Sequence, residues 1–148
     1  MKSAGEDVQM FDDIIGRCVA GRTIRAARVI TRQYDQALSD YGITITQFTL
    51  LVVIGQRQPR SIAVLADGLD IDRSTLSRNI AKLREAGLME KSVVTGRAQH
   101  LSLTAKGLNT LHAVYPKWRE VQDGIEAKLG EVGLSKVHES LEDLQSFR

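Results

Sequence analysis

The feature that most constrains the fold is a change of hydrophobic period within one stretch of the chain. In residues 73–86, apolar side chains recur at the spacing of one helix face, at Leu76, Ile80 and Leu83. Residues 88–103 change to the alternating spacing of two short strands joined by a turn at Gly96. The sequence therefore predicts a mainly α-helical fold in which one small β-hairpin directly follows a helix.

A long helix is expected before this region. Apolar residues keep a helical period from Phe11 to Tyr41, over about eight turns, and Gly42 ends the pattern. Because a glycine inside a helix costs about 1 kcal/mol relative to alanine, we expect this helix to bend near Gly16 or Gly21.

Capping residues mark where further helices begin. Thr44 and Gln47 have the spacing of a capping box, in which two side chains satisfy free backbone N–H groups at a helix start. Single N-cap residues open three later helices, at Ser61, Asp72 and Thr104.

The C-terminal segment contains two kinds of helix breaker. Pro116 lies inside a helical pattern and is expected to kink or split the helix, because proline removes a backbone donor and its ring crowds the preceding turn. Gly130 and Gly133 follow, and residues 134–144 predict a final helix with near-heptad apolar spacing.

We interpret residues 1–148 as a single domain built from two kinds of segment. Residues 44–103 hold the short helices and the hairpin, and residues 8–41 and 104–148 hold the long helices. The apolar stripes of the long helices exceed what a core of this size can cover, so we expect them to pack against a second copy. A two-fold dimer is the commonest such arrangement, and a monomer with a helical cap is the alternative.

Composition favours a soluble, cytoplasmic protein without membrane contact. The single cysteine, Cys18, excludes an intrachain disulfide, and the first residues are acidic where a signal peptide needs an apolar run. No apolar stretch reaches the length of a membrane span. The net charge is +2, but residues 57–106 contain nine basic and five acidic residues. This excess of positive charge is explained equally well by a phosphate-binding surface and by chance variation.

The face of residues 73–86 opposite the apolar stripe has the side chains that a major-groove helix needs. Small hydroxyl residues let the backbone approach DNA, and cations contact bases and phosphates. The candidate DNA-binding residues of this helix are Arg73, Ser74, Thr75, Ser77, Arg78 and Lys82. Arg78 is the candidate for a direct contact to guanine O6 and N7. An ordinary solvated helix face is the alternative interpretation.

The hairpin offers two further candidate DNA contacts. Arg97 lies beside Gly96 at the expected tip, where a single arginine is suited to the negative potential of the minor groove. His100, in the following strand, is a candidate phosphate contact. The alternative for Arg97 is an exposed loop side chain with no partner.

Residues 62–107 resemble the MarR family of bacterial and archaeal transcriptional regulators. The matching segments are Leu65-Ala66, Asp72 to Arg78, Leu83 to Leu88, Arg97 and Leu103 to Gly107, with Gly42 to Thr44 and Gln47-Phe48 outside that run. The resemblance implies a winged helix-turn-helix in residues 44–103, dimerisation through the long helices, and a pseudo-palindromic operator in double-stranded DNA. It also implies tuning by a small molecule or an oxidant, and repression is favoured over activation. Two residues depart from the family pattern. Thr95 stands where an Asp usually braces the wing, and Asp70 stands where the turn usually has Gly.

Three residues are candidates for sensing an effector. Tyr115 and Trp118 could line a cleft for a small aromatic or phenolic ligand, although for Trp118 the favoured interpretation is a core aromatic in the dimer interface. Cys18 is interpreted as a buried structural thiol, because cysteine is among the residues most often buried. Its alternative is a redox-sensing thiol activated by neighbouring arginines.

No enzyme motif or metal-ligand spacing is visible. The three histidines are scattered without cysteines or carboxylates at ligand spacing, and no phosphate-cradling loop appears. We therefore predict a regulator without catalytic activity, metal or cofactor. Two alternatives remain: a redox-sensing regulator that uses Cys18, and a winged-helix protein-interaction module that does not bind DNA.

Overall fold

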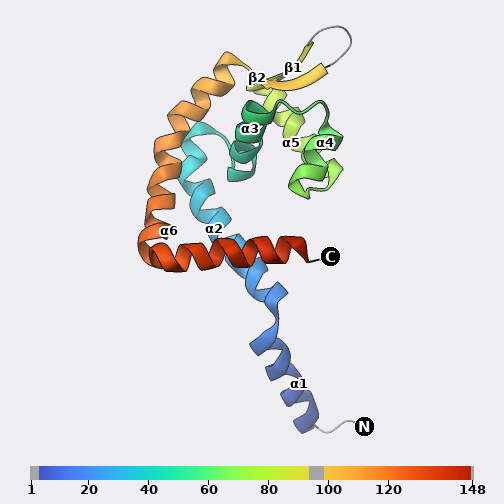
Figure 1. The fold of residues 1–148 in the computed structure, drawn as a ribbon, viewed down its shortest axis with the longest axis vertical. Helices are drawn as coiled ribbons and strands as arrows, with labels where there is room; N and C mark the ends of the chain where they lie inside the picture. Colours follow the sequence, from blue (N-terminus) through green and yellow to red (C-terminus); the bar gives the residue numbers. More distant parts are fainter. Residues whose placement is uncertain (1–3, 94–98, 148) are drawn as a thin grey trace.

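The structure, a computed structural model, describes residues 4–93 and 99–147 and is mainly helical with one two-stranded sheet, as predicted. The elements in chain order are α1 (Ala4–Arg17), α2 (Val19–Leu38), the 3-10 helix η1 (Ser39–Tyr41), α3 (Ile45–Arg57), α4 (Ile62–Leu69), α5 (Arg73–Glu85), β1 (Met89–Val93), β2 (Gln99–Leu103) and α6 (Ala105–Ser146). Helices α3, α4 and α5 and the hairpin form a compact head, and α2 runs beside the first half of α6 (Figure 1). Helix α1 projects away from both (Figure 1).

The predicted first long helix is two helices, and this is a correction. The break lies at Cys18, between the two glycines at which we expected a bend. Cys18 leaves the helical region with φ −63° and ψ 105°, and its Sγ accepts a hydrogen bond from the Gly21 N–H at 3.4 Å. Arg22 Nη2 donates to the Gly16 carbonyl at 2.9 Å. The break therefore falls where a side chain can cap the new helix, which neither glycine can do.

The predicted helix starts are confirmed. Thr44 and Gln47 form both hydrogen bonds of the capping box, Gln47 N to Thr44 Oγ1 at 3.2 Å and Thr44 N to Gln47 Oε1 at 3.1 Å. The hydroxyls of Ser61 and Thr104 each accept a backbone N–H from the first turn of the helix that they open. Local side chains thus fix the directions of α3, α4 and α6.

The expected break at Pro116 is wrong, since α6 stays helical through this residue. Pro116 is exposed, so water can replace the missing backbone donor. The helix instead turns at Gly130, where φ is 68° and ψ is 168°, a conformation that residues with a Cβ rarely adopt. Figure 1 shows the result, a second arm of α6 that runs across α2, below the head in this view.

The hydrophobic core lies within the head and includes residues from both long helices. Leu76, Ile80 and Leu83 of α5 are buried, as the helical spacing predicts. They share one cluster with Leu38 of α2 and Val114 of α6, which are fully buried. This shared core attaches the head to the long helices.

Polar contacts support the same attachment. The Tyr34 hydroxyl of α2 donates to Gln122 Oε1 of α6 at 2.6 Å. Burial, with a smaller contribution from the charge of Glu126, raises the pKa of Tyr34, so this hydroxyl keeps its proton. Asp35 Oδ1 of α2 accepts the backbone N–H of Ile45, the first residue of α3, at 2.7 Å.

Within the described residues, no single helix is long and apolar enough to cross a membrane. Among the described helices, one pair, Val19–Tyr41 with Ile45–Arg57, would meet that requirement together by length and composition alone, and this pair is bent by 76°.

Gly107 lets α6 begin against the start of the hairpin. A Cβ added at this position would overlap the carbonyl group of Leu88. The same carbonyl accepts the N–H of Thr104 at 3.2 Å, so the two backbones are held together. Only a glycine fits this contact without displacing backbone.

We expect Gly107→Ala to lower the free energy of unfolding by about 1–3 kcal/mol, because the added methyl group must displace the Leu88 backbone. The measurement is urea unfolding followed by circular dichroism. Gly68→Ala is the matched control, since an added Cβ there meets nothing within 4 Å. The control should be neutral or more stable by up to about 1 kcal/mol. Equal stability of the Gly107→Ala variant and the wild type would contradict the close contact.

Candidate nucleic-acid interface

The head contains a helix-turn-helix formed by α4 and α5. Asp70 ends α4 in the left-handed conformation, with φ 51° and ψ 39°. The N–H of Ile71 then returns to the Ala66 carbonyl at 3.2 Å. Aspartate tolerates this conformation better than most residues, so the turn forms without the glycine that the family usually has there.

Asp72 caps α5, as predicted. Its Oδ1 accepts the Ser74 N–H at 3.0 Å and the Ser74 hydroxyl at 2.9 Å, and its Oδ2 accepts the Thr75 N–H at 3.0 Å. Hydrogen bonds from Thr75 and then Ser74 hold the pKa of Asp72 far below its usual range. The cap is therefore an ionised carboxylate, and it orients the first turn of α5.

The structure brings five of the predicted contact residues of α5 onto one face. Ser74, Ser77, Arg78 and Lys82 are exposed there, and Thr75 is half-buried at its edge. Arg78 Nη2 donates to Thr75 Oγ1 at 3.1 Å, so the guanidinium group lies back along the helix toward its N-terminus. This face therefore offers hydroxyl groups and two cations together on one rigid helix.

Arg73, the sixth candidate of α5, is directed toward α4. Its Nη2 lies 3.7 Å from Asp67 Oδ1, and the two side chains are 70% and 73% exposed. An ion pair as exposed as this one contributes at most about 1 kcal/mol. Arg73 could therefore leave Asp67 to bind a phosphate.

The predicted strands are confirmed, and they pair antiparallel from Met89 with Leu103 to Val93 with Gln99. Arg97 lies outside the described residues, as do the neighbouring Thr95 and Gly96. Its assignment to the minor groove therefore stays a prediction. His100 is half-buried, and its Nδ1 lies 3.0 Å from the carbonyl oxygen of Gln58 at the end of α3.

The structure also places two cations near the hairpin that were not singled out from the sequence. Arg60 follows α3 and Lys91 lies in β1, and both line a pocket of about 410 Å³ together with His100. The basic excess of residues 57–106 includes both side chains, but charge counting does not reveal that they meet.

The predicted effector residues do not form one site. Trp118 stacks on Phe48 with ring centroids 6.3 Å apart, and on Tyr115 at 6.0 Å. Trp118 thus packs on the core of its own head, and Tyr115 is 51% exposed. The assignment of Trp118 to a dimer interface stays a prediction. Cys18 lies at the junction of α1 and α2, which is well separated from the first half of α6 (Figure 1). It is half-buried rather than buried, and its capping hydrogen bond favours a structural role over redox sensing.

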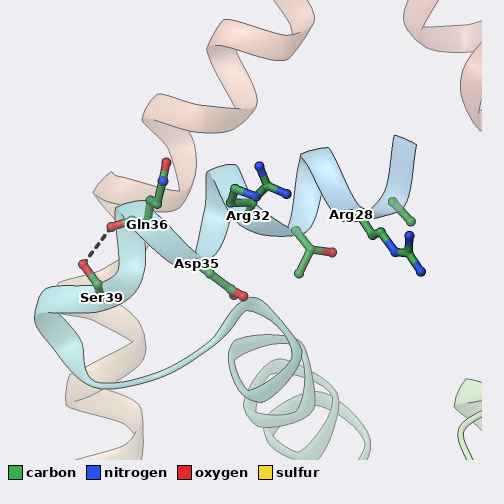
Figure 2. Close-up of a pocket in the computed structure, with 7 residues that line it drawn as sticks. Arg28, Arg32, Asp35, Gln36 and Ser39 are labelled. Atoms are coloured by element: carbon green, nitrogen blue, oxygen red, sulfur yellow. Dashed lines mark hydrogen bonds between the residues drawn. The ribbon is translucent and has the colours of Figure 1, made fainter. Parts of the chain in front are cut away.

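A groove of about 650 Å³ lies along the face of α2 that also carries Asp35 (Figure 2). The residues that line it are Ala27, Arg28, Thr31, Arg32, Asp35, Gln36 and Ser39. Asp35 points from α2 toward the start of α3, and its Oδ1 is occupied by the Ile45 N–H (Figure 2). The groove therefore offers two guanidinium groups beside the hydrogen bond that joins α2 to the head.

The described residues contain no group of three or more His, Cys, Asp or Glu side chains that could hold a metal ion. The interface described above consists instead of hydroxyl groups, cations and helix termini.

Comparisons with known proteins agree with this geometry. The family model described as MarR family matches residues 41–98. The crystal structure of the transcriptional regulator MosR from Mycobacterium tuberculosis is 33% identical, with a TM-score of 0.76 over 87% of this chain and 93% of that chain. A second structure shows MosR in complex with DNA, at 33% identity and a TM-score of 0.75 over 86% of this chain and 93% of that chain.

Two curated proteins are similar over shorter segments. The HTH-type transcriptional repressor Rv2887 of M. tuberculosis is 31% identical over 85 residues, which are 56% of this chain and 61% of the repressor. A riboflavin kinase of Haloquadratum walsbyi is 38% identical over 61 residues, which are 41% of this chain and 26% of the kinase. The chain thus spans between a quarter and two thirds of the length of the curated relatives it matches. The match to the kinase covers too little of either protein to assign an enzyme activity to this chain.

Proposed function

This chain belongs to the MarR family of winged helix-turn-helix transcriptional regulators, and on that premise we propose that it is a repressor that binds a two-fold symmetric operator as a homodimer. The observation that carries the proposal is the exposed face of α5, where Ser74, Thr75, Ser77, Arg78 and Lys82 lie together. A protein bound to such an operator blocks access by RNA polymerase, which favours repression.

The chemistry of this face suits the major groove. Ser74 and Ser77 are small, so they let the helix backbone approach the base edges. Arg78 carries a forked donor group that matches O6 and N7 of guanine. Its hydrogen bond to Thr75 restricts the guanidinium before DNA arrives, which lowers the entropy lost on binding.

The first experiment is selection of bound sequences from a random pool of DNA duplexes by the purified full chain. Recovery of a symmetric site with half-sites about one helical turn, or 34 Å, apart is expected for a dimeric reader. Arg78→Ala should cost about 1–3 kcal/mol in binding and relax the preference at one base position of each half-site. Unchanged affinity and selection in this variant would contradict the proposed role of Arg78.

Lys82→Ala is the comparison variant for this test. Because a phosphate contact carries no base information, it should weaken all sequences alike and reduce the slope of log affinity against log salt by about 1. Absence of any selected site with a folded wild-type protein would instead favour the protein-interaction module.

The dimer proposal rests on large apolar side chains that this chain leaves exposed. They are concentrated on α1, the first half of α2 and the second arm of α6: Val8, Phe11, Ile14, Ile15, Val19, Ile24, Val132, Val137, Leu141 and Leu144. Exposed apolar side chains in such number favour an interaction site. Both ends of the chain contribute to this surface, which suits the self-complementary contact of a two-fold pair.

We expect Leu141→Glu to shift the protein from dimer to monomer, because the proposed interface would then bury an uncompensated charge. Light scattering coupled to gel filtration measures the mass at several concentrations. Val52→Glu is the matched control, since Val52 is equally exposed at 41% but lies on α3. A monomeric wild type, or equal dissociation of both variants, would refute this interface.

We assign the effector to the groove on α2 rather than to Tyr115 and Trp118. Arg28 and Arg32 are four residues apart on one helix, a like-charge spacing that is unfavourable unless something compensates it. Within the described part of the chain, no carboxylate lies at ion-pair distance from either guanidinium. Solved structures of Rv2887 hold salicylic acid and p-aminosalicylic acid, which supports an aromatic acid as the ligand class.

A ligand in this groove would act through the contact between α2 and the head. The hydrogen bond from Ile45 N to Asp35 Oδ1 lies at its edge. If a ligand binds more tightly when the head has shifted against α2, it increases the population of that shifted state. DNA affinity falls if the shifted state binds the operator less well.

Salicylate added to the protein–operator complex should therefore release DNA. Arg28→Ala should raise the concentration required by roughly tenfold, since a charge-assisted hydrogen bond contributes about 1.5–3 kcal/mol. Fluorescence anisotropy of labelled operator measures the release. Arg25→Ala is the control, because Arg25 lies on the same helix but does not line the groove. Equal effects of the two substitutions would reject the groove, and no release from the wild type would reject this ligand class.

A further inference from the structure

The pocket lined by Arg60, Lys91 and His100 has no role in the proposed function. Of these three residues, only His100 was predicted from the sequence to contact a phosphate. It lies between the start of α4 and the hairpin and has a volume of about 410 Å³. Its other lining residues are Ser61, Ile62, Ala63 and Leu101, so no carboxylate group lines it. A concave site with basic groups and no acid is suited to an oxyanion.

The backbone on one side of this pocket is held rigidly. Gln58 ends α3 in the left-handed conformation with φ 44°, which is uncommon for a residue with a Cβ. Two contacts to β2 hold it there: Leu101 N donates to the Pro59 carbonyl at 2.9 Å, and His100 Nδ1 lies 3.0 Å from the Gln58 carbonyl. Arg60 therefore starts from a fixed position beside the hairpin.

The other two sides also present positive charge. Lys91 is paired with Leu101 in the hairpin, so both side chains lie on the same face, and Leu101 is buried. The Lys91 stem thus begins at the edge of the core and its ammonium group is exposed. The first N–H groups of a helix have no acceptor within that helix, and those of α4 belong to Ile62 and Ala63, which border the pocket.

We propose that this pocket binds phosphates of the DNA strand that lies between the major groove read by α5 and the minor groove next to it. This inference rests on the proposed function. The sugar–phosphate backbone is the ridge that separates the two grooves, so a subunit that reads both has this ridge between its two reading elements. The pocket lies in that position, because α4 packs against α5 and the two strands lead on to the hairpin tip.

Single substitutions that remove one charge test the site. Arg60→Gln and Lys91→Gln should each lower affinity about fivefold at 0.15 M salt, for operator and unrelated duplex alike, because each releases about one counterion fewer. Each should reduce the salt slope by about 1 and leave the selected bases unchanged. Arg119→Gln is the matched control, since Arg119 is an exposed cation on α6, and it should change neither quantity. Circular dichroism verifies that each variant is folded.

A second measurement locates the contact on the DNA. Operator duplexes are made with one neutral methylphosphonate in place of each phosphate in turn. The wild type should lose affinity at one or two positions on the ridge, and Arg60→Gln should show no further loss at the same positions. Additive losses at every position, or an unchanged salt slope in both variants, would overturn the inference.

Inorganic phosphate distinguishes the two sources of this ligand chemistry. Binding of inorganic phosphate near Arg60 and Lys91, seen by NMR, together with unchanged DNA affinity in both variants would assign the pocket to a free oxyanion and overturn the DNA assignment. If the wild type selects no operator, the proposed function itself fails. If it selects one that both variants bind equally well, only this inference fails.

Discussion

Burial of one face of α5 determines where its opposite face points. Leu76, Ile80 and Leu83 insert into a core that also contains Leu38 of α2 and Val114 of α6. Truncating a fully buried leucine costs several kcal/mol, so rotating α5 about its axis is prohibitively unfavourable. The direction of its polar face is therefore set by apolar packing, and the same packing joins the head to both long helices.

Polar groups then refine what the core has placed. Asp35 and Tyr34, neighbours on α2, connect this helix to α3 and α6 through single hydrogen bonds of 2.7 Å and 2.6 Å. A hydrogen bond between neutral groups contributes about 0.5–1.5 kcal/mol, and one to a charged group such as Asp35 contributes about 1.5–3 kcal/mol, so the two together contribute less than the core. The head is thus firmly attached, yet its angle to α2 depends on weak contacts that a bound molecule can outweigh.

Local signals in the sequence predicted most of the fold, because capping and periodicity depend on residues within one or two turns. Thr44, Ser61, Asp72 and Thr104 all cap as expected. The errors at Pro116 and Cys18 have another origin: whether water can replace a donor, or a thiol can reach an N–H, depends on three-dimensional surroundings. The exposed face of α5 was foreseeable, because it follows from the spacing of apolar residues within that one helix. That Arg60 and Lys91 line one pocket was not foreseeable, since the thirty residues between them must fold to bring them there.

The cap of α5 also restricts how this helix can approach DNA. The positive end of a helix dipole ordinarily attracts phosphate, but at α5 an ionised Asp72 already occupies that end and uses the N–H groups of Ser74 and Thr75. A phosphate arriving head-on would meet like charge, and the N–H groups of Ser74 and Thr75 are already in use. An end-on approach is thereby disfavoured. In the proposed complex, α5 would instead lie with its flank along the groove floor, where side chains from consecutive turns would meet successive base pairs.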